Sequence, residues 1–179
     1  MTDESYRPFI ESLLKRGHES PLEFGSIMFE IVTSRDVMAE LTRHRLASFC
    51  IQSQRYVDES KTGDIEFIRP LFFKDEADDV MHPSQDKNYV SSRIWRNQMM
   101  ECEETYRRMR EIGMRNEDAR KVLPNSTATR IMMKVNFREL LHIYKLRSAP
   151  AAYPEMVELM RLLKIEVDKV LPGFLPEKE

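Results

Sequence analysis

The segment from Arg43 to Arg55 limits how this chain can fold more than any other part of it. It reads Arg-His-Arg-Leu-Ala-Ser-Phe-Cys-Ile-Gln-Ser-Gln-Arg, so three cationic or titratable side chains precede two serines and a further arginine. Burying the first three side chains without partners would cost several kcal/mol, and a plain solvated face would not need the interleaved apolar and hydroxyl residues. The pattern favours a site for a planar ligand with several negative charges. Arginine binds phosphate through two hydrogen bonds, serine adds short ones, and histidine can change its protonation state.

Composition narrows the class of protein. The chain has 179 residues, enough for a sizeable core, and we expect residues 1–179 to form a single domain. The formal net charge of -2 argues against general affinity for nucleic acid, and so against an RNA-binding module built on residues 43–55. Glycine is scarce, with five residues, and no glycine-rich phosphate loop is present. Side chains and helix ends would therefore have to hold any nucleotide phosphate.

The sequence carries no signal for export or membrane insertion. No apolar run reaches the roughly 18 residues that cross a bilayer, and the start, Met-Thr-Asp-Glu-Ser, lacks the basic and apolar regions of a secretory signal. Cys50 and Cys102 lack the Cys-x-x-Cys spacing, so we expect two free thiols in a cytoplasmic protein. No group of residues has the ligand spacing of a calcium or zinc site, and no metal is predicted.

Hydrophobic periodicity and capping residues predict alternating helices and strands. Thr33 and Asn136 each precede an acidic residue by three positions, which is the spacing of a capping box that opens a helix. Residues 74–88, which include His82, are polar and acidic and predict a loop. The predicted helices cover residues 5–16, 33 to about 42 or 46, 89–112, 116–121, 136–147 and 154–170, and the predicted strands cover 26–33, 65–70 and 131–135.

The helix predicted to begin at Asn136 is the second informative segment. Arg138 and His142 lie four residues apart and so share one helix face, and Arg147 closes the last turn. A helix N-terminus attracts anions, so Asn136 and Arg138 could hold a phosphate or the edge of a flavin. On the residues alone another interpretation stays open, in which Arg138 is a surface residue and Arg147 only complements the helix dipole.

The first segment resembles the signature of the flavin-dependent thymidylate synthases, also called thymidylate synthase-complementing proteins. That signature has Arg-His-Arg, two residues, Ser, four residues, Ser, one residue and Arg, and Arg43, His44, Arg45, Ser48, Ser53 and Arg55 match it. Residues 136–147 resemble the family's Asn-x-Arg-x-Leu-x-His-x-x-x-Leu-Arg block. Residues 17–23, 119–127 and 151–156 resemble three further blocks of the family. The resemblance covers roughly His18 to Phe174.

The resemblance implies a fold and a reaction. The fold would be α/β (α+β), with a central mixed or antiparallel sheet and flanking helices. The protein would be a homotetramer whose active sites are shared between subunits, with the helix over residues 89–112 as an interface element. The reaction would be the reductive methylation of dUMP to dTMP. Methylenetetrahydrofolate would supply the carbon, and FAD reduced by NADPH would supply the hydride.

The resemblance also assigns site residues, one position at a time. Arg147 and Ser53 would lie at the reaction centre, with Ser53 binding phosphate or substrate because no base is paired with it as a nucleophile would need. Residues around dUMP would be Glu40, Arg43, Gln52, Ser53, Arg55, Arg120 and Arg147. Residues around FAD would be His18, Ser20, Arg43, His44, Arg45, Leu46, Asn136, Arg138 and His142.

The chain departs from the family's pattern at several positions. Cys50 and Ile51 stand where many members have Asn-Glu, Glu40 stands where others have Gln, and His142 stands where some have Asn. The chain also starts after the strand and short helix with which members usually begin, so we expect a shortened N-terminus without the first strand, or a fragment. These departures motivate an alternative function, a non-catalytic homologue that binds nucleotide or flavin without turnover.

Cys50 is a tempting nucleophile that the sequence does not support. Classical thymidylate synthases use a cysteine, but that chemistry needs an activated thiolate in a different motif. Phe49 and Ile51 flank Cys50 and predict a buried or half-buried thiol. We therefore expect Cys50 to have no covalent role.

Overall fold

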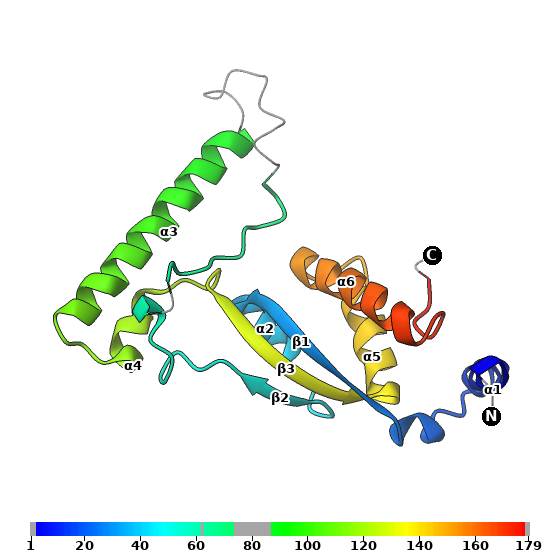
Figure 1. The fold of residues 1–179 in the computed structure, drawn as a ribbon. Helices are drawn as coiled ribbons and strands as arrows, with labels where there is room; N and C mark the ends of the chain where they lie inside the picture. The colour runs from blue at the N-terminus through cyan, green and yellow to red at the C-terminus, as the bar shows by residue number, and fades with distance from the viewer. Residues whose placement is uncertain (1–2, 62, 74–86, 178–179) are drawn as a thin grey trace. The chain divides into compact units, whose positions relative to one another are not determined.

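The computed structural model describes residues 3–61, 63–73 and 87–177 (Figure 1). Most of the loop predicted over residues 74–88, with His82, lies outside these described residues. By its internal contacts the chain divides into two compact units. The first unit comprises residues 1–29, 44–49 and 133–179, and the second comprises residues 30–43 and 50–132. The expectation of a single domain stays a prediction.

Three strands form the sheet. Strands β1 (Ser26–Ser34), β3 (Ala128–Asn136) and β2 (Ser48–Ile51) lie in the antiparallel order β1-β3-β2 (Figure 1). The predicted α/β architecture, a central sheet with flanking helices, is confirmed. The strands predicted over 26–33 and 131–135 are present and extend further than expected.

Two sequence predictions about strands and caps are wrong. Residues 65–70 form no strand, and Phe67 makes a single antiparallel bridge to Thr127. Pro70 has no amide to donate, which limits any longer pairing there. The helix after β1 takes Ser34, not Thr33, as its N-cap, and the side chain of Ser34 makes no hydrogen bond to the cap. Strand β2 lies within the signature, where no strand was predicted.

The first unit is built around α5 (Phe137–Arg147) and α6 (Pro154–Val170). Asn136 caps α5, since its side-chain oxygen accepts a hydrogen bond of 2.8 Å from the amide of Glu139, and the predicted cap is confirmed. The buried side chains that α5 and α6 contribute are Leu140, Ile143, Tyr144, Met156, Met160, Leu163 and Val167. Helix α1 (Asp3–Lys15) ends before Gly17, whose φ of 68° few other residues tolerate, and the short 3-10 helix η1 (Ser20–Glu23) follows.

The second unit contains α2 (Arg35–Leu41), the long helix α3 (Lys87–Glu111) and α4 (Asn116–Ala119). Two 3-10 turns, η2 (Glu59–Lys61) and η4 (Arg120–Val122), contact α3. The fully buried Tyr106 of α3 packs in one cluster with Ile65 and Ala119. One turn later, Arg110 forms an ion pair of 2.8 Å with Asp58. These contacts fix α3 against the segment that follows the signature.

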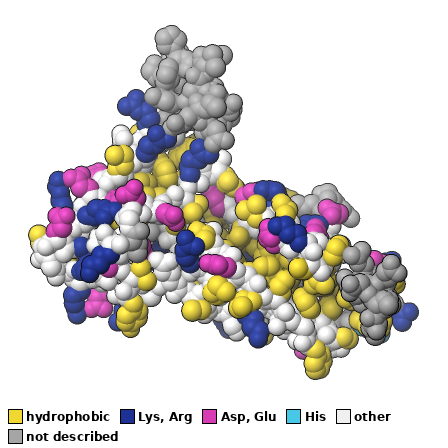
Figure 2. Space-filling view, viewed as in Figure 1, with side chains coloured by type: hydrophobic (Ala, Val, Ile, Leu, Met, Phe, Trp, Pro, Cys, Tyr) yellow, Lys and Arg dark blue, Asp and Glu magenta, His cyan; other side chains and the backbone are white. Residues whose placement is uncertain are grey.

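Charged side chains of both signs are interspersed over the face shown in Figure 2, and hydrophobic side chains also reach that face. Several large apolar side chains of the second unit are exposed, namely Val32, Leu71, Phe72, Val90, Ile94, Met100, Ile112 and Met132. Among the described residues, no helix combines the length and the apolar character that crossing a membrane requires.

Candidate active site

Two cavities of the first unit meet at the start of α5. One has a volume of about 670 Å³ and the other about 510 Å³. Glu19 and Arg138 line both of them, so the cavities adjoin. The larger is also lined by Glu23, Leu46, Asn136, Glu139, Leu141, His142 and Lys145, and the smaller by Leu13, Gly17, His18, Ser20 and Pro21.

Arg138 links the two cavities to η1. Its Nε donates to Glu19 at 3.1 Å, and its Nη1 donates to Glu23. The hydrogen bond with Glu23, and then the one with Glu19, raise the pKa of Arg138. Two carboxylates therefore hold one guanidinium at the cavity wall, leaving a net charge of -1. All three side chains are about half exposed, so exchange of one carboxylate for another anion is inexpensive.

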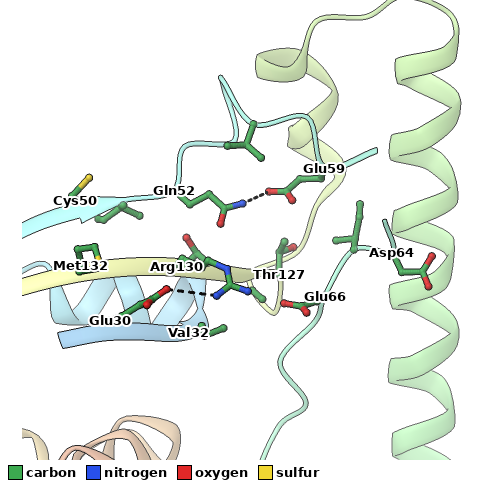
Figure 3. A pocket seen from close by; sticks show the side chains of 15 residues that line it. Glu30, Val32, Cys50, Gln52, Glu59, Asp64, Glu66, Thr127, Arg130 and Met132 are labelled. Carbon is green, nitrogen blue, oxygen red and sulfur yellow. Dashed lines mark hydrogen bonds and ion pairs between the residues drawn. The ribbon is translucent and has the colours of Figure 1, made fainter. Parts of the chain in front are cut away.

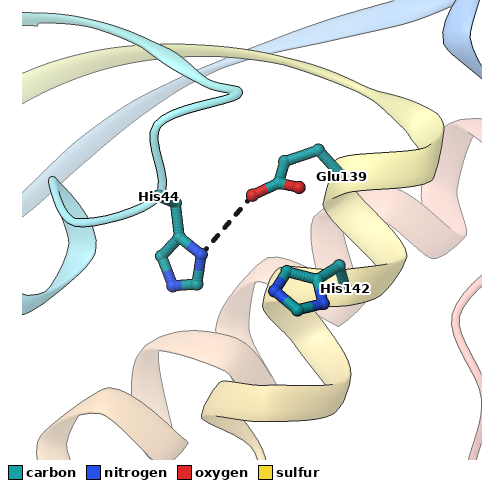
Figure 4. Close-up of side chains that lie close together, drawn as sticks. All are labelled: His44, Glu139 and His142. Atoms are coloured by element: carbon teal, nitrogen blue, oxygen red, sulfur yellow. Dashed lines mark ion pairs between the residues drawn. The ribbon is translucent and has the colours of Figure 1, made fainter.

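His44 is the most buried of the predicted flavin residues, and it lies beside α5 (Figure 4). Its Nδ1 is 3.5 Å from Oε1 of Glu139, and its Nε2 accepts a hydrogen bond of 2.9 Å from Nε of Arg147. The ring of His142 stands edge-on to it, with ring centroids 6.0 Å apart. Arginine can only donate, so Nε2 carries no proton and the neutral ring is protonated at Nδ1.

Burial and charge both keep His44 neutral. Burial lowers the pKa of His44 most, the Arg147 guanidinium lowers it further, and Glu139 opposes them. Because the ring faces a cation on one side and a carboxylate on the other, it donates to Glu139 and accepts from Arg147. The three side chains thus form one directed hydrogen-bond chain.

His44, Glu139 and His142 also offer atoms that lie within 4.8 Å of one another, close enough to hold a metal ion. A metal ion at Nδ1 of His44 would move the ring proton to Nε2. That nitrogen already faces the N–H of Arg147, so two donors would then oppose each other. The geometry therefore favours the hydrogen-bond chain over metal binding.

The second unit has a cavity of about 610 Å³ next to β2 and β3 (Figure 3). Its charged lining consists of Glu30, Glu59, Asp64 and Glu66 against Arg130. The apolar and neutral lining residues include Val32, Cys50, Ile51, Gln52, Val57, Ile65, Thr127, Thr129 and Met132. The cavity is therefore predominantly acidic.

Glu59 is the buried carboxylate of this cavity. Gln52 donates to it at 3.4 Å from Nε2, and the two side chains point toward one another in Figure 3. Burial raises the pKa of Glu59, and the nearby Arg35 opposes that shift. Burial likewise lowers the pKa of Arg35, which donates to the backbone oxygen of Gln52 at 3.3 Å. The wall of this cavity thus includes a buried acid and an amide, and the partly buried Arg35 lies close to both.

The predicted dUMP residues of the second unit do not converge on this cavity. Among the residues that the structure places there, Gln52 is the predicted one that lines it. Arg43 is exposed at the end of α2, one turn after Glu40, whose backbone oxygen accepts its amide at 3.3 Å. Arg55 pairs with Glu117 at 3.5 Å. Their positions as dUMP ligands stay predictions.

The remaining predicted residues are spread over both units. Ser53 accepts the amide of Arg55 at 3.3 Å, and Arg120 lies in η4 near enough to Arg35 to lower its pKa. Arg147 belongs to the first unit. Cys50 is exposed and lines the cavity, so the expectation of a buried or half-buried thiol is wrong. The neighbouring Phe49 is partly buried, and in an extended strand alternate side chains point to opposite faces.

Most predicted flavin residues gather in the first unit. Six of them line its two cavities, namely His18, Ser20, Leu46, Asn136, Arg138 and His142. His44 is buried against Glu139, and Arg45 is exposed. Arg43 belongs to the second unit.

Several residues of these sites were not predicted as functional. Glu139 was visible in the sequence only as the acidic partner of the Asn136 cap, and Glu23 only as part of a resembling block. Glu19 had no signal of its own. The sequence placed Arg35 in a predicted helix cap and Glu59 in no predicted element. Their proximity could therefore not be predicted.

Comparisons with known proteins bear on this arrangement. The family model described as thymidylate synthase complementing protein matches residues 1–173. A flavin-dependent thymidylate synthase of Geobacter sulfurreducens is 35% identical over 161 residues, covering 87% of this chain and 64% of the relative. Those of Halobacterium salinarum and Nitratidesulfovibrio vulgaris are both 34% identical, covering 90% and 98% of this chain and 70% and 75% of their own lengths. The chain belongs to the family of thymidylate synthase complementing proteins, the flavin-dependent thymidylate synthases.

Proposed function

We propose that this chain forms dTMP from dUMP by reductive methylation, with methylenetetrahydrofolate as carbon donor, FAD as flavin and NADPH as reductant. The carrying observation is the family match over residues 1–173, which includes every sequence block that resembles the synthases. The named activity of the relatives, flavin-dependent thymidylate synthase, supports this function over that of a non-catalytic homologue.

The first unit suits a flavin nucleotide in size and in donor chemistry. The volumes of its two adjoining cavities fall in the usual range of about 300–1,000 Å³ for ligand sites. His18, Ser20 and Asn136 offer polar atoms, Arg138 offers an exposed guanidinium, and Leu46 offers an apolar side chain. Bound FAD, once reduced by NADPH, would supply the hydride.

The chain's own residues would bind and orient this group. The positive end of the α5 helix dipole and the guanidinium of Arg138 favour a diphosphate there, since both stabilise negative charge. The phosphate would replace Glu19 or Glu23 on Arg138, which their exposure allows. His142 would contact the flavin from the larger cavity. Arg43, His44 and Arg45 would complete the set from the signature.

We assign dUMP to the arginines and serine of the signature. Arg43, Arg55 and Arg120 would bind the phosphate as bidentate donors, and Ser53 would add a hydroxyl. Gln52 would stand in for the polar side chain that Ile51 lacks. Glu40 would remain beside the substrate as a carboxylate paired with a basic residue. Arg147 would fix the pyrimidine ring and polarise it, so that the protein contributes orientation and electrostatics.

A homotetramer in the cytoplasm completes the proposal. The exposed apolar residues of α3, Val90, Ile94 and Met100, support its role as a subunit interface, because exposed apolar clusters mark contact surfaces. Sedimentation velocity would test the tetramer. A monomeric holoprotein at micromolar concentration would contradict it.

Product formation tests the activity directly. Purified protein is incubated without oxygen with FAD, NADPH, methylenetetrahydrofolate and dUMP, and dTMP is measured by mass spectrometry. We expect dTMP only in the complete mixture, with reactions lacking FAD or NADPH as controls. If no dTMP forms while dUMP still binds, the alternative of a non-catalytic binding protein replaces the proposed function.

A further inference from the structure

We propose that Glu139 and His44 are positioning residues that orient the guanidinium of Arg147 through the hydrogen-bond chain Glu139–His44–Arg147. The proposed function assigns His44 to the flavin, and the sequence showed Glu139 only as the acidic partner of the Asn136 cap. The geometry instead joins both to the arginine at the far end of α5. The importance of this chain for dUMP binding rests on the proposed function, whereas the chain itself does not.

The direction of each hydrogen bond determines the tautomer of His44. Arg147 donates from Nε at 2.9 Å, so Nε2 of His44 must present its lone pair. Only the tautomer protonated at Nδ1 does so while neutral, and that proton faces Oε1 of Glu139 at 3.5 Å. Glu139 therefore selects the tautomer that can accept from Arg147. Without this carboxylate the ring could place its proton on Nε2 and turn a donor toward Arg147.

The geometry of helix α5 explains how Glu139 and Arg147 reach the same imidazole ring. Glu139 and Arg147 stand eight residues apart on α5, about 12 Å along its axis. The long arginine side chain leans back toward the helix N-terminus, as side chains on helices do, and so reaches the same imidazole. His44 comes from the turn between α2 and β2 and is 6% exposed, while Glu139 is 7% exposed. One buried ring thereby links the third helical residue to the last.

Burial makes the arrangement selective. His142, also on α5, stands edge-on to His44, so the groups that face the ring are Glu139, His142 and Arg147. Inside such a site an unpaired polar atom is costly, and the chain is the arrangement that satisfies both ring nitrogens. An arginine held at Nε has its guanidinium fixed in a defined direction.

Preorganisation sets the expected size of the effect. A long side chain that is already ordered loses less freedom when it binds a ligand. Removing the orientation should weaken dUMP binding about three- to ten-fold. FAD affinity should fall less than dUMP affinity in Glu139→Ala, because Arg147 lines neither flavin cavity although Glu139 lines the larger one.

Three variants of the full-length holoprotein separate positioning from simple disruption. Glu139→Ala removes the acceptor of His44, yet the Asn136 cap survives because it uses the backbone amide of residue 139. Glu139→Gln keeps an oxygen acceptor and should restore most of the dUMP affinity. Glu166→Ala removes an exposed carboxylate from α6 and serves as the matched control. Affinities for dUMP and FAD are measured separately by calorimetry and flavin fluorescence.

The tautomer of His44 is read independently by nitrogen-15 NMR of the side-chain ring, assigned with His44→Gln. We expect an unprotonated Nε2 in the wild type and in Glu139→Gln, and a mixed or reversed tautomer in Glu139→Ala. This readout needs no substrate. If wild-type protein binds no dUMP, the proposed function fails and the tautomer signal alone decides the positioning role.

The proposal is overturned by any one of three results. The first is an Nε2 that carries the proton in wild-type protein. The second is a folded Glu139→Ala variant with the wild-type tautomer. The third is a loss of dUMP and FAD affinity together in that variant, without rescue by Glu139→Gln. Selective loss of dUMP affinity, its rescue by Glu139→Gln and the tautomer change together support it.

Discussion

The two units present their charges in opposite ways. In the first unit each guanidinium of the site is already engaged, Arg138 by two carboxylates and Arg147 by the His44 ring. In the second unit the cavity is lined by four carboxylates and Arg130, while the exposed guanidinium of Arg55 pairs with Glu117. The first unit thus has a polar site whose side chains are already paired. The second unit has an acidic cavity, and Arg55 lies outside it.

This difference indicates where an anionic ligand can be held. A phosphate inside the second unit's cavity would face Glu30, Glu59, Asp64 and Glu66, and like charges in apposition are costly. We therefore expect the substrate phosphate to be held by the exposed arginines of the signature and not within this cavity. In the first unit the positive end of the α5 helix dipole and the guanidinium of Arg138 lie together, and both favour an anion.

The largest expected effect tests whether the two units fold as one. Leu140 of the first unit and Leu41 of the second are both fully buried, and either Leu→Ala should cost about 2–5 kcal/mol of unfolding free energy. Each of the three strands contributes residues to both units, so we expect one cooperative transition that both variants shift. Far-ultraviolet circular dichroism follows both units, and Trp95 fluorescence follows the second. Two separate transitions, each moved by one variant alone, would contradict a single domain.

The next effect separates the ligands of the two units. Arg138→Ala should weaken flavin binding about ten- to a hundred-fold, because it removes a charge-assisted donor at the start of α5. Arg55→Ala should instead weaken dUMP binding by a similar factor and leave flavin occupancy unchanged. Flavin absorbance and dUMP calorimetry measure the two affinities, with substitution of the exposed Arg161 of α6, Arg161→Ala, as the control. Binding of both ligands unchanged in both variants would refute the residue assignment.

A smaller effect concerns what holds the second unit together. Asp58 accepts from Arg110 at 2.8 Å and from the hydroxyl of Ser60 at 2.6 Å, and these bonds, the Arg110 one foremost, hold its pKa far below the usual range. Asp58→Asn should cost about 1–3 kcal/mol at neutral pH. The stabilisation is present above the unfolded pKa near 3.9 and is lost as the pH falls below it. Urea unfolding at pH 7 and pH 3 should show the variant's deficit shrinking in acid. An equal deficit at both pH values would assign the loss to packing.

Local chemistry decided what the sequence could predict. The helix opened by Asn136 was predicted because a cap, an acidic partner and apolar periodicity all lie within a few residues. The family was predicted from spaced motifs and is confirmed by the comparisons. The ranges of the helices followed from the same short-range signals.

Tertiary context decided what the sequence could not predict. Residues 65–70 alternate like a strand but meet no neighbour beyond the Phe67–Thr127 bridge, since β3 pairs with β1 and β2. The contact between His44 and Arg147 joins positions 103 residues apart, so no local pattern reports it. The burial of Glu59 could not be predicted from a local pattern either, because its partner Arg35 lies in another element.

The smallest expected effect distinguishes the two units by pH. Burial, reinforced by Arg147, lowers the pKa of His44, so the unfolded imidazole takes up its proton near pH 6.5 before the folded one does. Stability from this group is therefore complete above about pH 6.5 and falls as the pH decreases toward the folded pKa, with a slope of at most about 1.4 kcal/mol per pH unit. His44→Asn keeps an acceptor for Arg147 and should flatten this part of the curve.

Glu59 gives the opposite sign. Burial raises its pKa, so the folded carboxyl keeps its proton to higher pH than the unfolded one, and stability falls as the pH rises from about 4.3 through the folded pKa. Glu59→Gln should remove that decline and leave the change near pH 6 intact, while His44→Asn should do the reverse. Chemical denaturation between pH 4 and pH 8 measures both slopes. If one variant removed both slopes, His44 and Glu59 would titrate as a coupled pair. That result would contradict the electrostatic independence of the two units.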